Sequence, residues 1–88
     1  MAHLYSKYKE VESLLQQRIS PLGYVAKVEP ITGTDLYYSD GAASASYGKV
    51  LFTSQTSEFV VFFPDMYCYF AVPNPIKEAL TAWLKEVA

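Results

Sequence analysis

The chain is poor in the residue types that build most catalytic and metal-binding sites. Its 88 residues include one histidine and one cysteine. The single cysteine, Cys68, has no second cysteine with which to form an intrachain disulfide or a cysteine-based zinc site. The histidine, His3, stands near the N-terminus, where the mobility of a chain end opposes the orientation that a catalytic base requires. We therefore expect no enzymatic activity, no catalytic residue, no metal site and no cofactor.

Glycine-rich loops and paired carboxylates are also missing from the sequence. The four glycines stand apart from one another, so they do not form a phosphate-binding loop. Asp35 and Asp40 flank a short apolar segment and are typical turn formers. Glu10 and Glu12 are two positions apart in a predicted helix, so they do not face each other. Cys68 lies on the apolar side of a predicted strand and is expected to be a small core residue.

Basic residues are few, with seven Lys and Arg against nine Asp and Glu and a net charge of −2. Duplex-binding proteins use clustered basic residues to neutralise phosphates, so binding of double-stranded nucleic acid is unfavourable here. No apolar run approaches the roughly 20 residues of a membrane span. The first residues also lack the apolar segment of a signal peptide. With no disulfide, these features predict a cytoplasmic protein that has no membrane partner.

Apolar residues, by contrast, are plentiful: 51% of the chain is hydrophobic and 18% is charged. This balance argues against disorder, and the length suits one domain over residues 1–88. Apolar residues with a period near 3.6 predict a helix over residues 3–19, which ends before Pro21 and Gly23. The apolar stripe of this helix is Leu4, Tyr8, Val11, Leu15 and Ile19. The side chains expected to face water are Lys9, Glu12, Ser13, Gln16 and Gln17.

A second helix and several strands are predicted between this helix and the C-terminus. Asn74 suits the N-cap of the last helix, and Pro75 suits its first position. The expected buried stripe of this helix is Ile76, Leu80, Trp83, Leu84 and Val87. Alternation and β-forming residues predict strands at residues 24–29, 36–39, 47–53, 58–63 and 66–72. Residues 58–63 are apolar on both faces, as in a central strand covered on both sides, and Gly48 marks a possible bulge.

The predicted fold is an α+β two-layer sandwich. An antiparallel sheet of four to five strands lies between one N-terminal and one C-terminal helix, in the order α-β-β-β-β-α. Both helices are expected on one sheet face, because two amphipathic helices need one apolar face to cover. Residues 42–46 are weakly patterned and suit either a loop or the start of a strand.

The order of helices and strands resembles that of the double-stranded RNA-binding domain family, at the level of topology alone. That family carries a lysine cluster at the start of its second helix. The corresponding segment here reads Asn74-Pro75-Ile76-Lys77-Glu78 and lacks the cluster. The resemblance therefore transfers no functional residue to this chain.

Tyrosine is the abundant chemical feature, with eight residues alongside five phenylalanines. Five tyrosines of the predicted sheet region are the candidate partner-binding residues: Tyr37, Tyr38, Tyr47, Tyr67 and Tyr69. Strand alternation places Tyr67 and Tyr69 opposite the face that is expected to meet the helices. Tyrosine is frequent in interfaces because its ring is rigid and apolar and ends in a hydroxyl. The alternative interpretation is that these rings only stabilise a half-exposed sheet through cross-strand pairs.

These observations favour a small, non-enzymatic protein-binding module whose partner is a host protein or a second copy of the chain. One form of this hypothesis is an inhibitor or adaptor of a phage or mobile element, of the anti-CRISPR or host-takeover kind. A second hypothesis is a single-stranded nucleic-acid-binding protein that stacks bases on the same tyrosines. A third is a homodimeric structural or accessory protein.

Overall fold

The structure, a computed structural model, describes residues 2–41, 43, 46–64, 66–68 and 72–87; for residues 2–4, 67 and 68 it describes the backbone alone. The elements follow in the order α1 (Ala2–Glu10), α2 (Glu12–Ile19), a 3-10 helix η1 (Ser20–Leu22), β1 (Val25–Glu29), α3 (Gly33–Tyr38), β2 (Gly48–Thr53), β3 (Glu58–Phe63), β4 (Tyr67–Cys68) and α4 (Asn74–Val87). Antiparallel pairing joins β1 to β2 and β2 to β3, and the two-residue β4 pairs with the end of β3.

The predicted four- to five-stranded sheet with one helix at each end of the chain is wrong. Within the described residues there are three antiparallel strands of five or six residues, a two-residue β4 and four α-helices. The predicted strand at residues 36–39 falls largely in helix α3, because a capping box upstream starts a helix there. Of the predicted strand at residues 66–72, β4 is the described strand part, and residues 69–71 lie outside the described residues.

The predicted N-terminal helix is divided into α1 and α2 at Val11, whose φ of −110° and ψ of 20° lie outside the helical range. Its N–H donates to Tyr8 O at 3.2 Å, and its carbonyl accepts the indole Nε1–H of Trp83 at 3.1 Å. The break therefore joins the N-terminal segment to α4.

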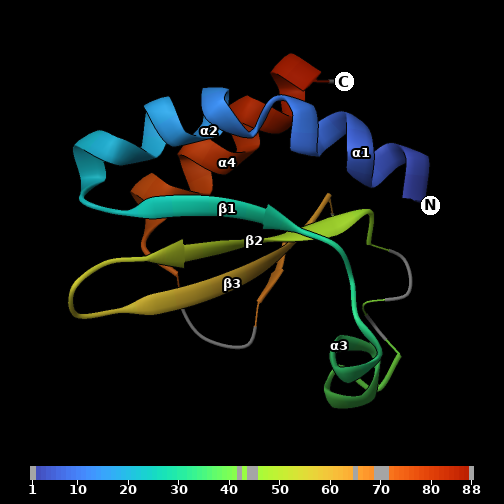
Figure 1. Cartoon of the computed structure of the whole chain (residues 1–88). Coiled ribbons are helices and arrows are strands. Elements are labelled where there is room, and N and C mark those ends of the chain that lie inside the picture. The colour runs from blue at the N-terminus through green and yellow to red at the C-terminus, as the bar shows by residue number, and fades with distance from the viewer. Residues whose placement is uncertain (1, 42, 44–45, 65, 69–71, 88) are drawn as a thin grey trace.

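The main core lies between the sheet and a layer of helices. Figure 1 shows α1, α2 and α4 on one side of the sheet, and α3 apart from them at one end. Alternate strand residues point into this core, and among them Ala26, Val28, Val50, Phe52, Val61 and Phe63 are buried. The helices contribute the buried residues Tyr8, Leu15, Ile19, Ile76, Leu80 and Trp83, which lie on the predicted stripes. Each fully buried large side chain of this kind contributes about 1.5–3 kcal/mol.

The C-terminal half of β3 is covered on both faces, as the sequence predicts for the whole strand, whereas Glu58 is exposed and Phe59 and Val60 are half-buried. Val61 and Phe63 belong to the main core cluster, whereas Phe62 is buried outside this cluster, on the other face of the strand. The register pairs Phe62 with Tyr67 of β4.

An aromatic cluster closes the core at the end of β3. The Phe63 ring lies 4.8 Å from the Tyr8 ring and 5.6 Å from the Trp83 ring, measured between centroids. The predicted bulge at Gly48 is wrong, because Gly48 pairs in regular register with Phe63. A Cβ on Gly48 would lie 2.9 Å from Phe63 Cζ, so the missing side chain makes room for this ring.

Candidate functional site

Helix α3 carries the candidate site, and a capping box fixes its N-terminus. Thr32 Oγ1 accepts a hydrogen bond from the Asp35 N–H at 3.2 Å, and Asp35 Oδ2 accepts one from the Thr32 N–H at 2.9 Å. N–H groups at the helix start, which lack helical acceptors, are satisfied in this way. At the other end, Asp40 and Gly41 have positive φ, and the Gly41 N–H donates to Leu36 O at 2.9 Å. The predicted Asp40-Gly41 turn is therefore confirmed.

A sheltered ion pair anchors α3 to the sheet. Lys49 Nζ of β2 lies 2.8 Å from Asp35 Oδ2, and the two side chains are 15% and 13% exposed. Burial raises the pKa of the Asp35 carboxyl, but hydrogen bonds from Lys49 and from Thr32 outweigh this effect and hold the pKa below its ordinary value. The sequence identified Asp35 as a turn former and did not reveal its pairing with Lys49.

The exposed face of α3 presents two tyrosine rings to solvent. Tyr37 is 78% exposed and Tyr38 is 71% exposed, and the adjacent Leu36 is also exposed. The two rings are 5.1 Å apart between centroids and meet edge to face, with 87° between their planes. Aromatic pairs favour this geometry, so each ring steadies its neighbour without any cover from the core.

Tyr47, Tyr67 and Tyr69 differ from this pair in their placement. The Tyr47 ring is half-buried and lies 6.0 Å from Tyr8, a core residue, so it packs with the main core. Tyr67 is in β4, where its backbone pairs with Phe62, and Tyr69 lies outside the described residues. Of the five predicted partner-binding residues, the structure thus brings Tyr37 and Tyr38 together on a helix.

The other residues considered from the sequence do not form a site within the described part of the chain. His3 lies in α1 and Cys68 in β4, where the backbone alone is described. No group of three or more His, Cys, Asp or Glu residues within the described ranges is placed to hold a metal ion. None of the described helices combines the length and the apolar character that crossing a membrane requires.

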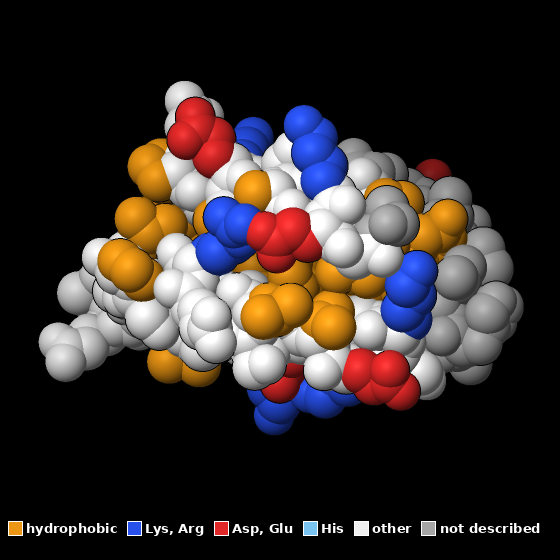
Figure 2. Space-filling model, turned by 90° about the horizontal axis from the view of Figure 1, so that it is seen from above, with side chains coloured by type: hydrophobic (Ala, Val, Ile, Leu, Met, Phe, Trp, Pro, Cys, Tyr) orange, Lys and Arg blue, Asp and Glu red, His pale blue; other side chains and the backbone are white. Residues whose placement is uncertain are grey.

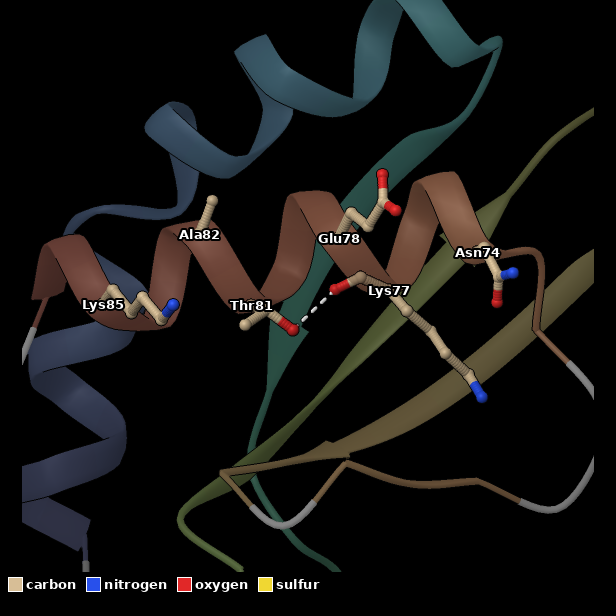
Figure 3. Close-up of a pocket in the computed structure, with 6 residues that line it drawn as sticks. All are labelled: Asn74, Lys77, Glu78, Thr81, Ala82 and Lys85. Carbon is tan, nitrogen blue, oxygen red and sulfur yellow. Dashed lines mark hydrogen bonds between the residues drawn. The ribbon is translucent and has the colours of Figure 1, made fainter.

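A shallow hollow runs along the outer side of α4 (Figure 3). Its lining residues are Asn74, Lys77, Glu78, Thr81, Ala82 and Lys85. Figure 3 shows Lys77 and Glu78 pointing to opposite sides of the helix. The Thr81 hydroxyl donates to Lys77 O at 2.8 Å, so it is already used within the helix. Because the polar groups diverge, the hollow does not present the convergent set that a small-molecule site needs.

Charges of both signs are mixed on the helical side of the molecule. Figure 2 looks onto this side and shows hydrophobic side chains with basic and acidic side chains interspersed around them. Arg18 of α2 forms an ion pair with Glu86 of α4, which joins the two helices. The face in view therefore lacks the continuous basic track along which nucleic-acid phosphates bind.

The sequence also missed a set of polar contacts between the N-terminal helices and β1. Lys9, Glu12 and Gln16 were expected to face water, but each of them hydrogen-bonds to the backbone of the strand segment. Burial raises the pKa of the Glu12 carboxyl, but hydrogen bonds from Lys9 and from the Val28 N–H bring the net pKa below its ordinary value. No pattern in a single sequence marks these contacts, because they depend on where the helix lies relative to the edge of the sheet.

Comparison with models of protein families, with curated proteins and with solved structures finds no match for the chain. The resemblance to the double-stranded RNA-binding domain therefore rests on the predicted order of elements alone, and helix α3 between β1 and β2 departs from that order.

Proposed function

We propose that this protein is a non-enzymatic protein-binding module that contacts its partner through Tyr37 and Tyr38 of α3. The observation that carries the proposal is an exposed pair of aromatic rings on a helix whose N-terminal end is capped and ion-paired to the sheet. Protein interfaces are enriched in tyrosine, and a few such residues supply most of the binding free energy. The two rings are available in the free protein and need no rearrangement to be reached.

The anchoring of α3 supports this proposal. The capping box and the Asp35–Lys49 ion pair fix the helix before any partner arrives. A preformed surface loses little conformational freedom on binding, so more of the contact free energy appears as affinity. An inhibitor or adaptor of a host protein, of the kind that phages and mobile elements encode, would need no more than such a surface.

The geometry gives less support to single-stranded nucleic acid as the partner. Base stacking requires open ring faces beside cationic groups that contact phosphates. The Tyr37 and Tyr38 rings are nearly perpendicular, so they do not form a flat platform for successive bases. Lys49, the basic residue that contacts α3, is already paired with Asp35.

Site-specific photo-crosslinking tests the proposal. We would place the photoreactive residue p-benzoylphenylalanine at position 37, and at Gln55 as a control. Gln55 is also exposed but lies in the β2–β3 turn, at the other end of the sheet from α3 (Figure 1). We expect a discrete protein adduct from position 37 and none from position 55. An adduct formed equally at both positions would contradict the proposal.

The affinity for the purified partner then measures the contribution of the rings. We expect Tyr37→Ala/Tyr38→Ala to weaken Kd by about 30- to 1,000-fold, since interface tyrosines of this kind contribute about 1–2 kcal/mol each. Gln55→Ala/Thr56→Ala is the matched control and should bind as the wild type does. An unchanged Kd for the tyrosine variant refutes the proposal, whereas oligonucleotide binding that weakens steeply with salt would support the nucleic-acid alternative.

A further inference from the structure

Strand β1 lies at one end of the strand order, so one of its edges has no neighbouring strand. A strand edge of this kind presents N–H and C=O groups on which the strand of another chain can pair. Ala26 and Val28 pair with Phe52 and Val50 of β2, and their own N–H groups point to the free edge.

Side chains of α1 and α2 occupy this free edge. Glu12 Oε2 accepts the Val28 N–H at 2.5 Å, and Gln16 Oε1 accepts the Ala26 N–H at 2.8 Å. Two donors satisfy carbonyl groups of the same segment: Gln16 Nε2 donates to Tyr24 O at 3.2 Å, and Lys9 Nζ donates to Val28 O at 3.1 Å. Lys9 Nζ also lies 2.8 Å from Glu12 Oε2.

The spacing of these side chains matches the spacing of the strand. Glu12 and Gln16 are four residues apart, which is about 6.0 Å along an α-helix. Ala26 and Val28 are two residues apart, which is about 6.6 Å along a strand. Since the helix runs antiparallel to β1, successive turns of α2 reach successive outward N–H groups of the strand.

We propose that Lys9, Glu12 and Gln16 form an edge guard that prevents β1 from pairing with β1 of a second copy of the chain. The guard supplies donors and acceptors that an added antiparallel strand would supply, and so occupies the N–H groups of Ala26 and Val28 to which a second copy would bind. Next to the guarded edge, the Val25 side chain is 62% exposed. Side chains of a second β1 strand, paired along this edge, would cover it. Removal of the guard therefore frees a backbone template beside an apolar side chain that is already exposed.

The experiment compares two double variants of the full chain. Glu12→Ala/Gln16→Ala removes two guard side chains, whereas Ser13→Ala/Gln17→Ala changes the adjacent exposed residues of the same helix and leaves the guard intact. Light scattering during size-exclusion chromatography gives the mass of each variant over a range of concentrations. We expect a concentration-dependent dimer from the first variant, while the second variant and the wild type stay monomeric.

Amide hydrogen exchange shows whether β1 is the contact. In the dilute monomer, the Ala26 and Val28 amides of the guard variant should exchange at least about tenfold faster than in the wild type, and dimerisation should protect them again. A folded guard variant that is monomeric at every concentration overturns the proposal, as does a dimer in which these amides stay unprotected. If the double variant does not fold, Gln16→Ala alone carries the same test with the Ala26 amide.

Discussion

The close fit between Gly48 and Phe63 predicts that Gly48→Ala destabilises the fold, although alanine suits a strand better than glycine does. An added Cβ would lie 2.9 Å from Phe63 Cζ and 3.1 Å from the Glu29 backbone oxygen. The Phe63 ring has no room to retreat, because it is fully buried and packed against the rings of Tyr8 and Trp83. The Glu29 oxygen belongs to β1, so it moves only with the strand.

The sign of the effect follows from two opposing magnitudes. Overpacking of a filled core by a methyl group costs about 1–3 kcal/mol, whereas removing a glycine from a strand gains about 0.5–1 kcal/mol. The difference between these ranges is a net loss of about 0–2.5 kcal/mol of unfolding free energy for Gly48→Ala, and their centres give about 1 kcal/mol. For a domain of this size each kcal/mol lowers Tm by about 4–8 °C.

Thermal and urea unfolding, followed by circular dichroism, measure this loss. Gly33→Ala is the matched control, because no atom lies within 4 Å of a Cβ added at that position, the start of α3. We expect Gly33→Ala to leave stability unchanged or to raise it. In a Phe63→Leu background, which removes Cζ, the penalty of Gly48→Ala should shrink. A Gly48→Ala variant as stable as the wild type would refute the packing argument.

Two further predictions concern the core and the acid stability. Trp83→Ala should lower the free energy of unfolding by about 3–5 kcal/mol, because the indole is fully buried. Urea unfolding followed by circular dichroism measures this loss, and the control Lys85→Ala, at an exposed position, should cost almost nothing. A loss below about 1 kcal/mol would contradict the core position of Trp83. In the folded protein, the pKa values of Glu12 and Asp35 lie below their ordinary values of 4.5 and 3.8. The stability that the two carboxylates contribute is therefore fully present above their ordinary pKa values, and it is lost as the pH falls through the lowered pKa values of the folded state. Tm measured from neutral pH down to about pH 2.5 should therefore decline in acid, and Asp35→Asn should decline less steeply than the wild type.

Side-chain periodicity predicted the helical layer and the central strand well, because burial of a long apolar stripe leaves few alternatives. Leu15, Ile19, Leu80 and Trp83 are all buried where the period of 3.6 placed them. Residues 58–63 form β3, with apolar side chains buried on both of its faces.

Short segments were predicted less well, because local hydrogen bonds decide their structure. Two adjacent tyrosines suggested a strand at residues 36–39, but Thr32 and Asp35 form a capping box and start a helix. Their spacing of three was visible in the sequence and was the signal that could have revealed α3. Two of the five candidate tyrosines, Tyr37 and Tyr38, were placed on that predicted strand, and the structure puts them on a helix. It packs a third candidate, Tyr47, with the core.

Polar contacts between distant elements were beyond the reach of the sequence. Glu12 and Gln16 look like ordinary surface residues of an amphipathic helix, and their role depends on the position of the β1 edge. The pairing of Asp35 with Lys49 likewise depends on how the β1–β2 connection folds back toward the sheet.

Two surface features of this chain differ in whether the fold covers them: the free edge of β1 and the tyrosine rings of α3. The fold covers the free edge of β1 with three side chains, yet it leaves Tyr37 and Tyr38 uncovered on α3. Tyr8 shows that a tyrosine can be placed in this core, since its ring is buried against Phe63 and Trp83. Rings that stay in solvent add little to the stability of the free protein, because they bury little area. Stability thus accounts for the buried Tyr8. Under our proposals, the guard would keep β1 from pairing with a second copy, and a partner would cover the two exposed rings of α3.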